Sequence, residues 1–144
     1  MITELQVTTI AHAIQLAVAP VFLLTGIASI LSVLTTRLGR IIDRTRFLHG
    51  RLVTETLKSE SDQEELKTLK QRARLIHWAI GLCTGSLLLI CSVVAILFIG
   101  SFIEINVAMG IASLFIVAML CLILALLNFI GEIFLATARV RGAP

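Results

Sequence analysis

Residues 76–102, IHWAIGLCTGSLLLICSVVAILFIGSF, carry no Lys, Arg, Asp or Glu, and they decide the fold class of this protein. A helix needs about 20 consecutive apolar residues to cross a hydrocarbon core of about 30 Å, and this segment exceeds that length. Two further apolar segments meet the same requirement, one at residues 11–36 and one at residues 106–138. The sequence therefore predicts an all-α integral membrane protein with three transmembrane helices.

The composition of the 144-residue chain agrees with one membrane domain spanning residues 1–144. Apolar residues make up 58% of the chain, whereas soluble domains contain about 45–50%. A water-soluble domain of this size would expose too much of its surface to hide so many apolar side chains. Metal-ligand spacings, phosphate-binding loops and nucleophile motifs are absent from the sequence, so we predict neither enzymatic activity nor a bound metal or cofactor.

Basic residues set the expected orientation in the membrane. The chain has twelve Lys and Arg residues, and all of them lie between residues 37 and 74 or at positions 139 and 141. The N-terminus and the connection at residues 101–106 have none. Because Lys and Arg are enriched in cytoplasmic loops, we predict an external N-terminus and a cytoplasmic C-terminus.

The loop between the first two spans, residues 37–75, is predicted to be a cytoplasmic antiparallel helical hairpin. Its apolar residues recur at alternating steps of three and four, which places them on one face of a helix. They are Leu38, Ile41, Thr45, Leu48 and Leu52 in one half and Leu66, Leu69, Ala73 and Ile76 in the other. We expect the two halves to continue the flanking spans, to turn at the polar residues 58–63 and to pack as a short coiled coil.

Two motifs, AIQLAVAPVFLLTG at residues 13–26 and LTTRLGRIIDRTR at residues 34–46, carry a family resemblance. They resemble a family of small three-span bacterial membrane proteins known only as a domain of unknown function. That resemblance implies a bacterial inner-membrane protein with this three-span layout, and it brings no activity or catalytic residue. With the orientation expected from the basic residues, the N-terminus would then be periplasmic. In topology alone, the chain is also similar to the minimal core of the Oxa1-type insertase superfamily.

The first span carries a stripe at heptad-like spacing whose residues are small or polar apart from Phe22 and Val33. It includes His12, Gln15, Ala19, Gly26 and Ser29. One interpretation is a seam against another helix, because small residues let two membrane helices approach closely. The alternative is a wet surface that lines a pore formed by several copies. Pro20 lies in the same span and should bend it, which could serve as a gate or only as a shape.

The other spans offer two weaker signals. Gly81 and Gly85 form a G-x-x-x-G pattern, which favours close helix packing within the chain or between copies. Asn128 and Glu132 are four residues apart in the third span and are therefore neighbours on one helix face. Either Glu132 is embedded and needs a partner, or its carboxylate reaches headgroup water; the length of the span favours the second. The functional alternative places both residues at the cytoplasmic end of a cation pathway.

A cluster of arginines follows the first span directly and consists of Arg37, Arg40, Arg44, Arg46 and Arg51. We interpret it as a topology signal that also contacts anionic lipid headgroups. Nucleic-acid binding is not expected, because residues 37–75 contain six acidic residues beside ten basic ones and a single aromatic residue, Phe47.

Three thin helices leave much apolar surface uncovered, so we predict a homo-oligomer in the inner membrane. The first functional hypothesis is a non-enzymatic assembly that conducts ions or small solutes. The alternative is a biogenesis or scaffold factor whose cytoplasmic hairpin binds a protein partner.

Overall fold

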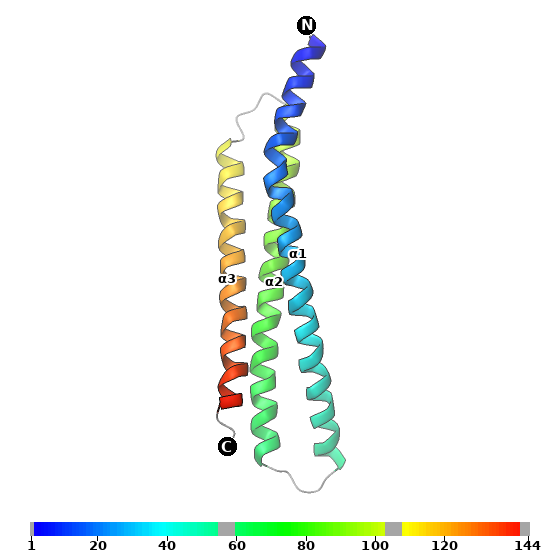
Figure 1. The fold of residues 1–144 in the computed structure, drawn as a ribbon, viewed down its shortest axis with the longest axis vertical. Coiled ribbons are helices and arrows are strands. Elements are labelled where there is room, and N and C mark those ends of the chain that lie inside the picture. The colour runs from blue at the N-terminus through cyan, green and yellow to red at the C-terminus, as the bar shows by residue number, and fades with distance from the viewer. Residues whose placement is uncertain (1, 55–59, 103–107, 142–144) are drawn as a thin grey trace. The chain divides into compact units, whose positions relative to one another are not determined.

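The computed structural model describes residues 2–54, 60–102 and 108–141, and the side chains of residues 7–51, 63–100 and 108–137. The described residues form three α-helices: α1 (Ile2–Thr54), α2 (Glu60–Phe102) and α3 (Ala108–Arg141) (Figure 1). Each helix is long and apolar enough to cross a membrane. The predicted all-α chain with three potential membrane spans is therefore confirmed, while its orientation stays a prediction.

The helices extend beyond the predicted spans. At about 1.5 Å per residue, the 53 residues of α1 reach about 80 Å and the 43 residues of α2 about 65 Å. Both lengths exceed a hydrocarbon core of about 30 Å, so a large part of each helix must project from the bilayer. The predicted helical continuation of the spans is confirmed in the described residues, and the side of the membrane on which it lies stays a prediction. The predicted turn falls partly on residues 58 and 59, outside the described residues, whereas α2 already contains residues 60–63.

Helix α2 ends and helix α3 begins near the predicted connection between the second and third spans, and the span boundaries themselves stay predictions. The second span was expected to end at residue 102, which is where α2 ends. The third span was expected to begin at residue 106, which lies outside the described residues, and α3 begins at Ala108. Helix α1 runs through Pro20 without interruption, so the missing backbone N–H does not break the helix. A bend at Pro20 stays a prediction.

The chain divides into two compact units, each built from a part of all three helices. The first unit consists of residues 1–30 and 83–123. Its buried side chains are small or medium in size: Ala13, Ala17 and Ile27 of α1, Cys83, Ser86, Ile90 and Val93 of α2, and Ala118 and Leu122 of α3. The Ser86 hydroxyl donates a hydrogen bond to the Ala118 carbonyl oxygen at 2.8 Å and thereby links α2 to α3. Such interhelical bonds satisfy polar groups that lipid cannot solvate.

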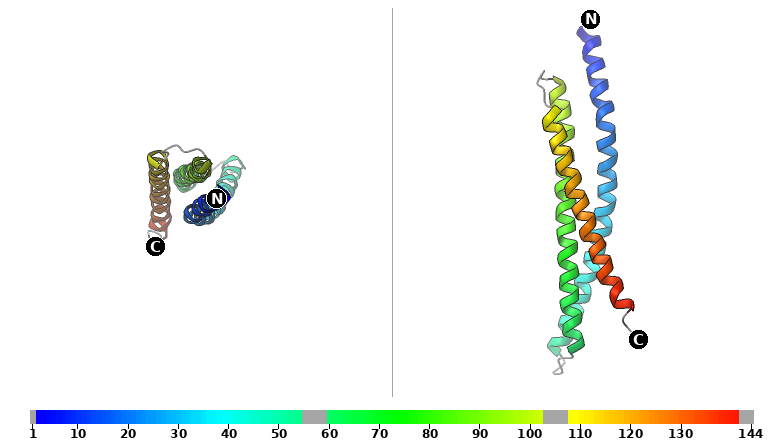
Figure 2. Two further views of the ribbon diagram at one scale, coloured as in Figure 1. Left: turned by 90° about the horizontal axis from the view of Figure 1, so that it is seen from above. Right: turned by 90° about the vertical axis from the view of Figure 1, so that its left-hand side faces the viewer.

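The second unit consists of residues 31–82 and 124–144. Within it, the α1 and α2 segments run antiparallel and side by side (Figures 1 and 2). Its buried side chains are Leu34, Ile41 and Leu48 of α1, Leu69, Ile76 and Ala79 of α2, and Ala125 and Glu132 of α3. The α1 positions are seven residues apart, which is the repeat of knobs-into-holes packing between helices. Each predicted stripe thus supplies buried residues to this unit.

A buried carboxylate and an arginine-lined pocket

Glu132 is the one buried charged residue among the described side chains, and its exposure is 0%. It follows Ala118, Leu122 and Ala125 on the buried face of α3, at successive steps of four, three and seven residues. Glu132 therefore occupies a position where this pattern would place an apolar side chain. The expectation that its carboxylate reaches headgroup water is wrong, because neighbouring side chains enclose it completely.

Two arginines from two other helices hold this carboxylate. Arg72 of α2 donates hydrogen bonds from Nε and Nη2 to Oε1, at 2.9 and 2.7 Å. Arg37 of α1 places Nη2 3.3 Å from Oε2, and its guanidinium lies over the Phe129 ring at 5.3 Å from the ring centre. Charge-assisted bonds of this kind are among the strong ones in proteins. One carboxylate thus connects the three helices of the second unit.

The two carboxylate oxygens differ in their surroundings. Oε1 accepts both hydrogen bonds from Arg72. Oε2 is buried and accepts no hydrogen bond from the described residues, since Arg37 Nη2 is near enough for an ion pair but is not aligned for a bond. Arg37 therefore contributes charge more than directed bonding, and Arg72 supplies the directed contacts.

A second ion pair joins α1 to α2 one heptad away from the first. Arg44 donates from Nε to Glu65 Oε1 at 2.9 Å and from Nη2 to Glu65 Oε2 at 3.3 Å. Arg44 is seven residues after Arg37, and Glu65 is seven residues before Arg72. The equal steps follow from antiparallel packing in a heptad register. The side chains of Arg44 and Glu65 are 49% and 29% exposed, so this pair should stabilise the fold by less than about 1 kcal/mol.

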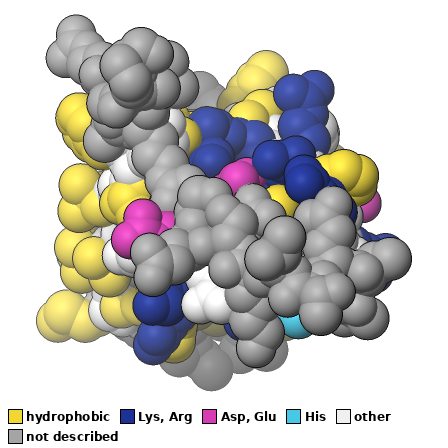
Figure 3. All heavy atoms as spheres, turned by 90° about the horizontal axis from the view of Figure 1, so that it is seen from below, with side chains coloured by type: hydrophobic (Ala, Val, Ile, Leu, Met, Phe, Trp, Pro, Cys, Tyr) yellow, Lys and Arg dark blue, Asp and Glu magenta, His cyan; other side chains and the backbone are white. Residues whose placement is uncertain are grey.

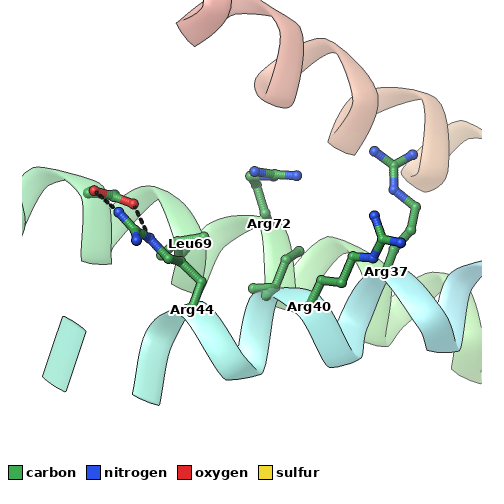
Figure 4. Close-up of a pocket in the computed structure, with 7 residues that line it drawn as sticks. Arg37, Arg40, Arg44, Leu69 and Arg72 are labelled. Carbon is green, nitrogen blue, oxygen red and sulfur yellow. Dashed lines mark hydrogen bonds and ion pairs between the residues drawn. The ribbon is translucent and has the colours of Figure 1, made fainter. Parts of the chain in front are cut away.

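The same two helices enclose a pocket of about 350 Å³, which we name the arginine pocket. Its lining consists of Arg37, Arg40, Ile41, Arg44, Glu65, Leu69 and Arg72 (Figure 4). Figure 3 shows Lys and Arg side chains gathered beside acidic ones on the face seen from below. The pocket brings together three of the five predicted cluster residues, Arg37, Arg40 and Arg44. Arg46 and Arg51 are exposed and do not line it.

The remaining predicted site residues lie elsewhere. The small and polar residues of the first span, which we name the α1 stripe (His12, Gln15, Ala19, Gly26 and Ser29), are all exposed. At 3.6 residues per turn they lie on the face of α1 opposite the buried Ala13, Ala17 and Ile27. Among the described side chains, the α1 stripe is therefore not buried against another helix.

Two further predicted contacts, close helix packing at Gly81 and Gly85 and a pair formed by Asn128 and Glu132, are not found among the described residues. A Cβ atom added at Gly81 or Gly85 would meet nothing within 4 Å, so no neighbouring helix approaches closely there. Asn128 is half-buried, and its Nδ2 donates to the Leu124 carbonyl oxygen at 2.8 Å within α3. Glu132 is bound instead to Arg72 and Arg37, and no hydrogen bond joins it to Asn128 among the described residues.

Sequence reasoning missed the role of Arg72, although the sequence carries a signal for it. Leu69, Ile76, Ala79 and Cys83 are buried on α2. Arg72 lies between the first two of these at the same alternating steps of three and four, and so falls on the buried face. A charged residue on a buried face needs a partner of opposite charge, and Glu132 is the acidic residue that interrupts an apolar segment elsewhere in the chain.

The fold and these contacts define a class: a helical membrane protein with three spans whose helices are joined by a buried ionic cluster. More particularly, the chain belongs to the family described as "Protein of unknown function (DUF2721)", whose model matches residues 17–141. The predicted resemblance to a family of unknown function is thereby confirmed. No curated protein and no solved structure matches the chain.

Proposed function

We propose that this protein is a non-enzymatic component of the bacterial inner membrane that assembles into a homo-oligomer and conducts ions or small solutes. One observation carries the proposal: the α1 stripe is exposed on the outer face of α1. Polar and small side chains are not what hydrocarbon favours at a lipid-facing position. Another copy of α1, or water in a shared pore, would cover this face at a lower free energy than lipid.

The outer surface of α3 provides the contrast. Its most exposed side chains in the middle of the span are aliphatic, namely Ile116, Val117, Leu120, Ile123, Leu124 and Leu127. Such side chains suit direct contact with lipid tails. We therefore assign α3 to the lipid-facing side of the assembly and α1 to the side where copies meet.

The ion pairs of Glu132 with Arg72 and Arg37 remove Glu132 from the expected pore lining. The carboxylate of Glu132 is fully buried and bound by Arg72 and Arg37, so it is not available to line a cation pathway. We assign Glu132 to holding the three helices together. The α1 stripe alone then remains as the candidate lining, and because it contains no Lys, Arg, Asp or Glu, it gives no reason to expect strong selectivity between cations and anions.

The proposal is tested by cysteine substitution in proteoliposomes. In a background without Cys83, Cys91 and Cys121, single cysteines are placed at Gln15 and Ser29 on the stripe. Val21→Cys is the matched control, because Val21 is exposed on the same helix but, at 3.6 residues per turn, faces away from the stripe. We expect solute flux that a water-soluble thiol reagent blocks at Gln15→Cys and Ser29→Cys, and that is unaffected at Val21→Cys.

Two outcomes contradict this proposal. One is a monomer in lipid nanodiscs together with the absence of flux, and the other is flux that the reagent blocks at Val21→Cys but at neither stripe position. Absence of flux with copurifying ribosomes or nascent membrane clients would instead favour the biogenesis alternative.

A further inference from the structure

The arginine pocket gathers positive charge beyond what the fold uses. Four guanidinium groups line it, from Arg37, Arg40, Arg44 and Arg72, beside one carboxylate, Glu65. Glu132 does not line the pocket but binds two of these arginines from the side of α3. Even after both carboxylates are counted, an excess of two positive charges remains around the pocket.

Arg40 is the arginine of the pocket whose positive charge is not paired with a carboxylate among the described residues. It is exposed and lines the pocket, and no ion pair or hydrogen bond to another described residue is found for it. In Figure 4 its side chain extends along α1 toward Arg37. Two like charges near each other repel, and an anion bound between them would offset this repulsion by attracting both. The arrangement therefore favours a bound anion.

The other walls of the pocket restrict what that anion can be. Ile41 and Leu69 also line the pocket and are buried, with exposures of 4% and 7%. Arginine presents a planar fork of donors that matches the oxygens of a phosphate. A pocket lined by arginines and by apolar side chains therefore suits a ligand that has a phosphate group and an apolar part better than a halide ion.

The position of the pocket in the sequence, next to two predicted spans, also favours a phosphate-bearing ligand. Arg37 follows directly on the predicted first span, and Arg72 precedes the predicted second span by four residues. Seven residues of helix, the separation from Arg37 to Arg44, cover about 10 Å, which is comparable to the thickness of a headgroup layer. Basic pockets between membrane helices at this depth are sites where anionic headgroups bind.

We propose that the arginine pocket binds a phosphate-bearing anion through Arg40, with Arg44 and Arg72 at its sides. The phosphate belongs either to an anionic lipid or to a soluble compound. This site is separate from the α1 stripe and does not depend on conduction.

The experiment uses the full chain and compares Arg40→Gln with Arg46→Gln. Both changes remove one positive charge from α1, but Arg46 is exposed and lies outside the pocket. Detergent-purified protein is titrated with phosphatidylglycerol and with phosphatidylcholine, and bound lipid is counted by native mass spectrometry. A second titration with inorganic phosphate, followed by calorimetry, tests the soluble source.

We expect one phosphatidylglycerol per chain at the lowest concentrations, and binding that is about tenfold weaker in Arg40→Gln than in the native protein. Arg46→Gln should bind as the native protein does. Saturable binding of inorganic phosphate that depends on Arg40, without preference for phosphatidylglycerol, would support the site and assign it to a soluble anion. Equal binding of both lipids with no phosphate binding, or an equal loss in the two variants, would overturn the proposal.

Arg40→Lys keeps the positive charge but lacks the planar fork, and it separates loss of binding from loss of fold. If Arg40→Gln unfolds, Arg40→Lys should remain folded and should bind the anion more weakly than the native protein. Native affinity in Arg40→Lys, together with native affinity in Arg40→Gln where that variant folds, would also overturn the proposal.

Discussion

Replacing Glu132 by Gln should strongly destabilise the second unit. The change removes the negative charge that faces Arg72 and Arg37 and leaves the size of the side chain nearly unaltered. Breaking a buried ion pair by removing one partner destabilises a protein by about 3–5 kcal/mol, because the remaining charge stays without compensation. The side chains of Arg72 and Arg37 are 23% and 32% exposed, so water can partly solvate them and the lower end of this range applies. We expect a loss of about 3 kcal/mol, or about 150-fold in the unfolding equilibrium constant.

Unfolding by sodium dodecyl sulfate in mixed micelles measures this loss. Trp78 is the single tryptophan of the chain and belongs to the same unit as Glu132, so its fluorescence reports on the relevant helices. Circular dichroism provides a second probe of the same transition. The matched control is Glu65→Gln, which removes the same charge from a partly exposed pair and should destabilise by less than about 1 kcal/mol.

A double-mutant cycle identifies the partner. Arg72→Gln should be more destabilising than Arg37→Gln, because Arg72 donates two hydrogen bonds at 2.7 and 2.9 Å whereas Arg37 approaches only to 3.3 Å. In the double variant Glu132→Gln with Arg72→Gln, the loss should be smaller than the sum of the single losses. The reasoning is refuted if Glu132→Gln and Glu65→Gln unfold at the same detergent fraction, or if the cycle with Arg72 shows no coupling.

Three further predictions concern other parts of the chain. Ser86→Ala should destabilise the protein by about 1 kcal/mol in detergent unfolding, since it removes the hydrogen bond from α2 to α3. Ser92→Ala is its control and should change the unfolding curve little, because the Ser92 hydroxyl bonds within α2. Gly81→Ala should leave the chain as stable as before or slightly more stable, because a Cβ atom there meets nothing within 4 Å; weaker self-association in nanodiscs would place this glycine between copies. For the orientation, Arg46→Cys should react with an impermeant thiol reagent only after the cells are opened and Val7→Cys should react in intact cells, and the reverse pattern would overturn the assigned topology.

Much of the fold was predictable because it rests on local patterns. Apolar segments longer than a bilayer is thick can hardly be anything but helices. The alternating steps of three and four in residues 37–75 also identified the side chains that pack, since Ile41, Leu48, Leu69 and Ile76 are all buried. A repeat of seven residues predicts both the helix and its contact face without any knowledge of its partner.

The site was less predictable because it depends on contacts between distant residues. Glu132 could be recognised as unusual from its apolar neighbours, but the length of a span does not show which groups of other helices face it. Its partners follow only from the register of the three helices. Arg72, for example, is 60 residues away from Glu132 in the sequence. The inward face of α1 was also ambiguous, because Ala13 and Ala17 are small, as are Ala19, Gly26 and Ser29 of the α1 stripe. The choice between the two faces is made by shape complementarity with α2 and α3, which a single sequence does not contain.

The buried cluster has a consequence for how the protein is made. Synthesis proceeds from the N-terminus, so Arg37 and Arg72 leave the ribosome long before Glu132 does. A carboxylate that enters the bilayer region alone would be expensive to desolvate. Both counter-ions precede Glu132 along the chain, so they are synthesised before the helix that carries it. The order of the charges along the chain thereby favours correct assembly of the third helix onto the first two.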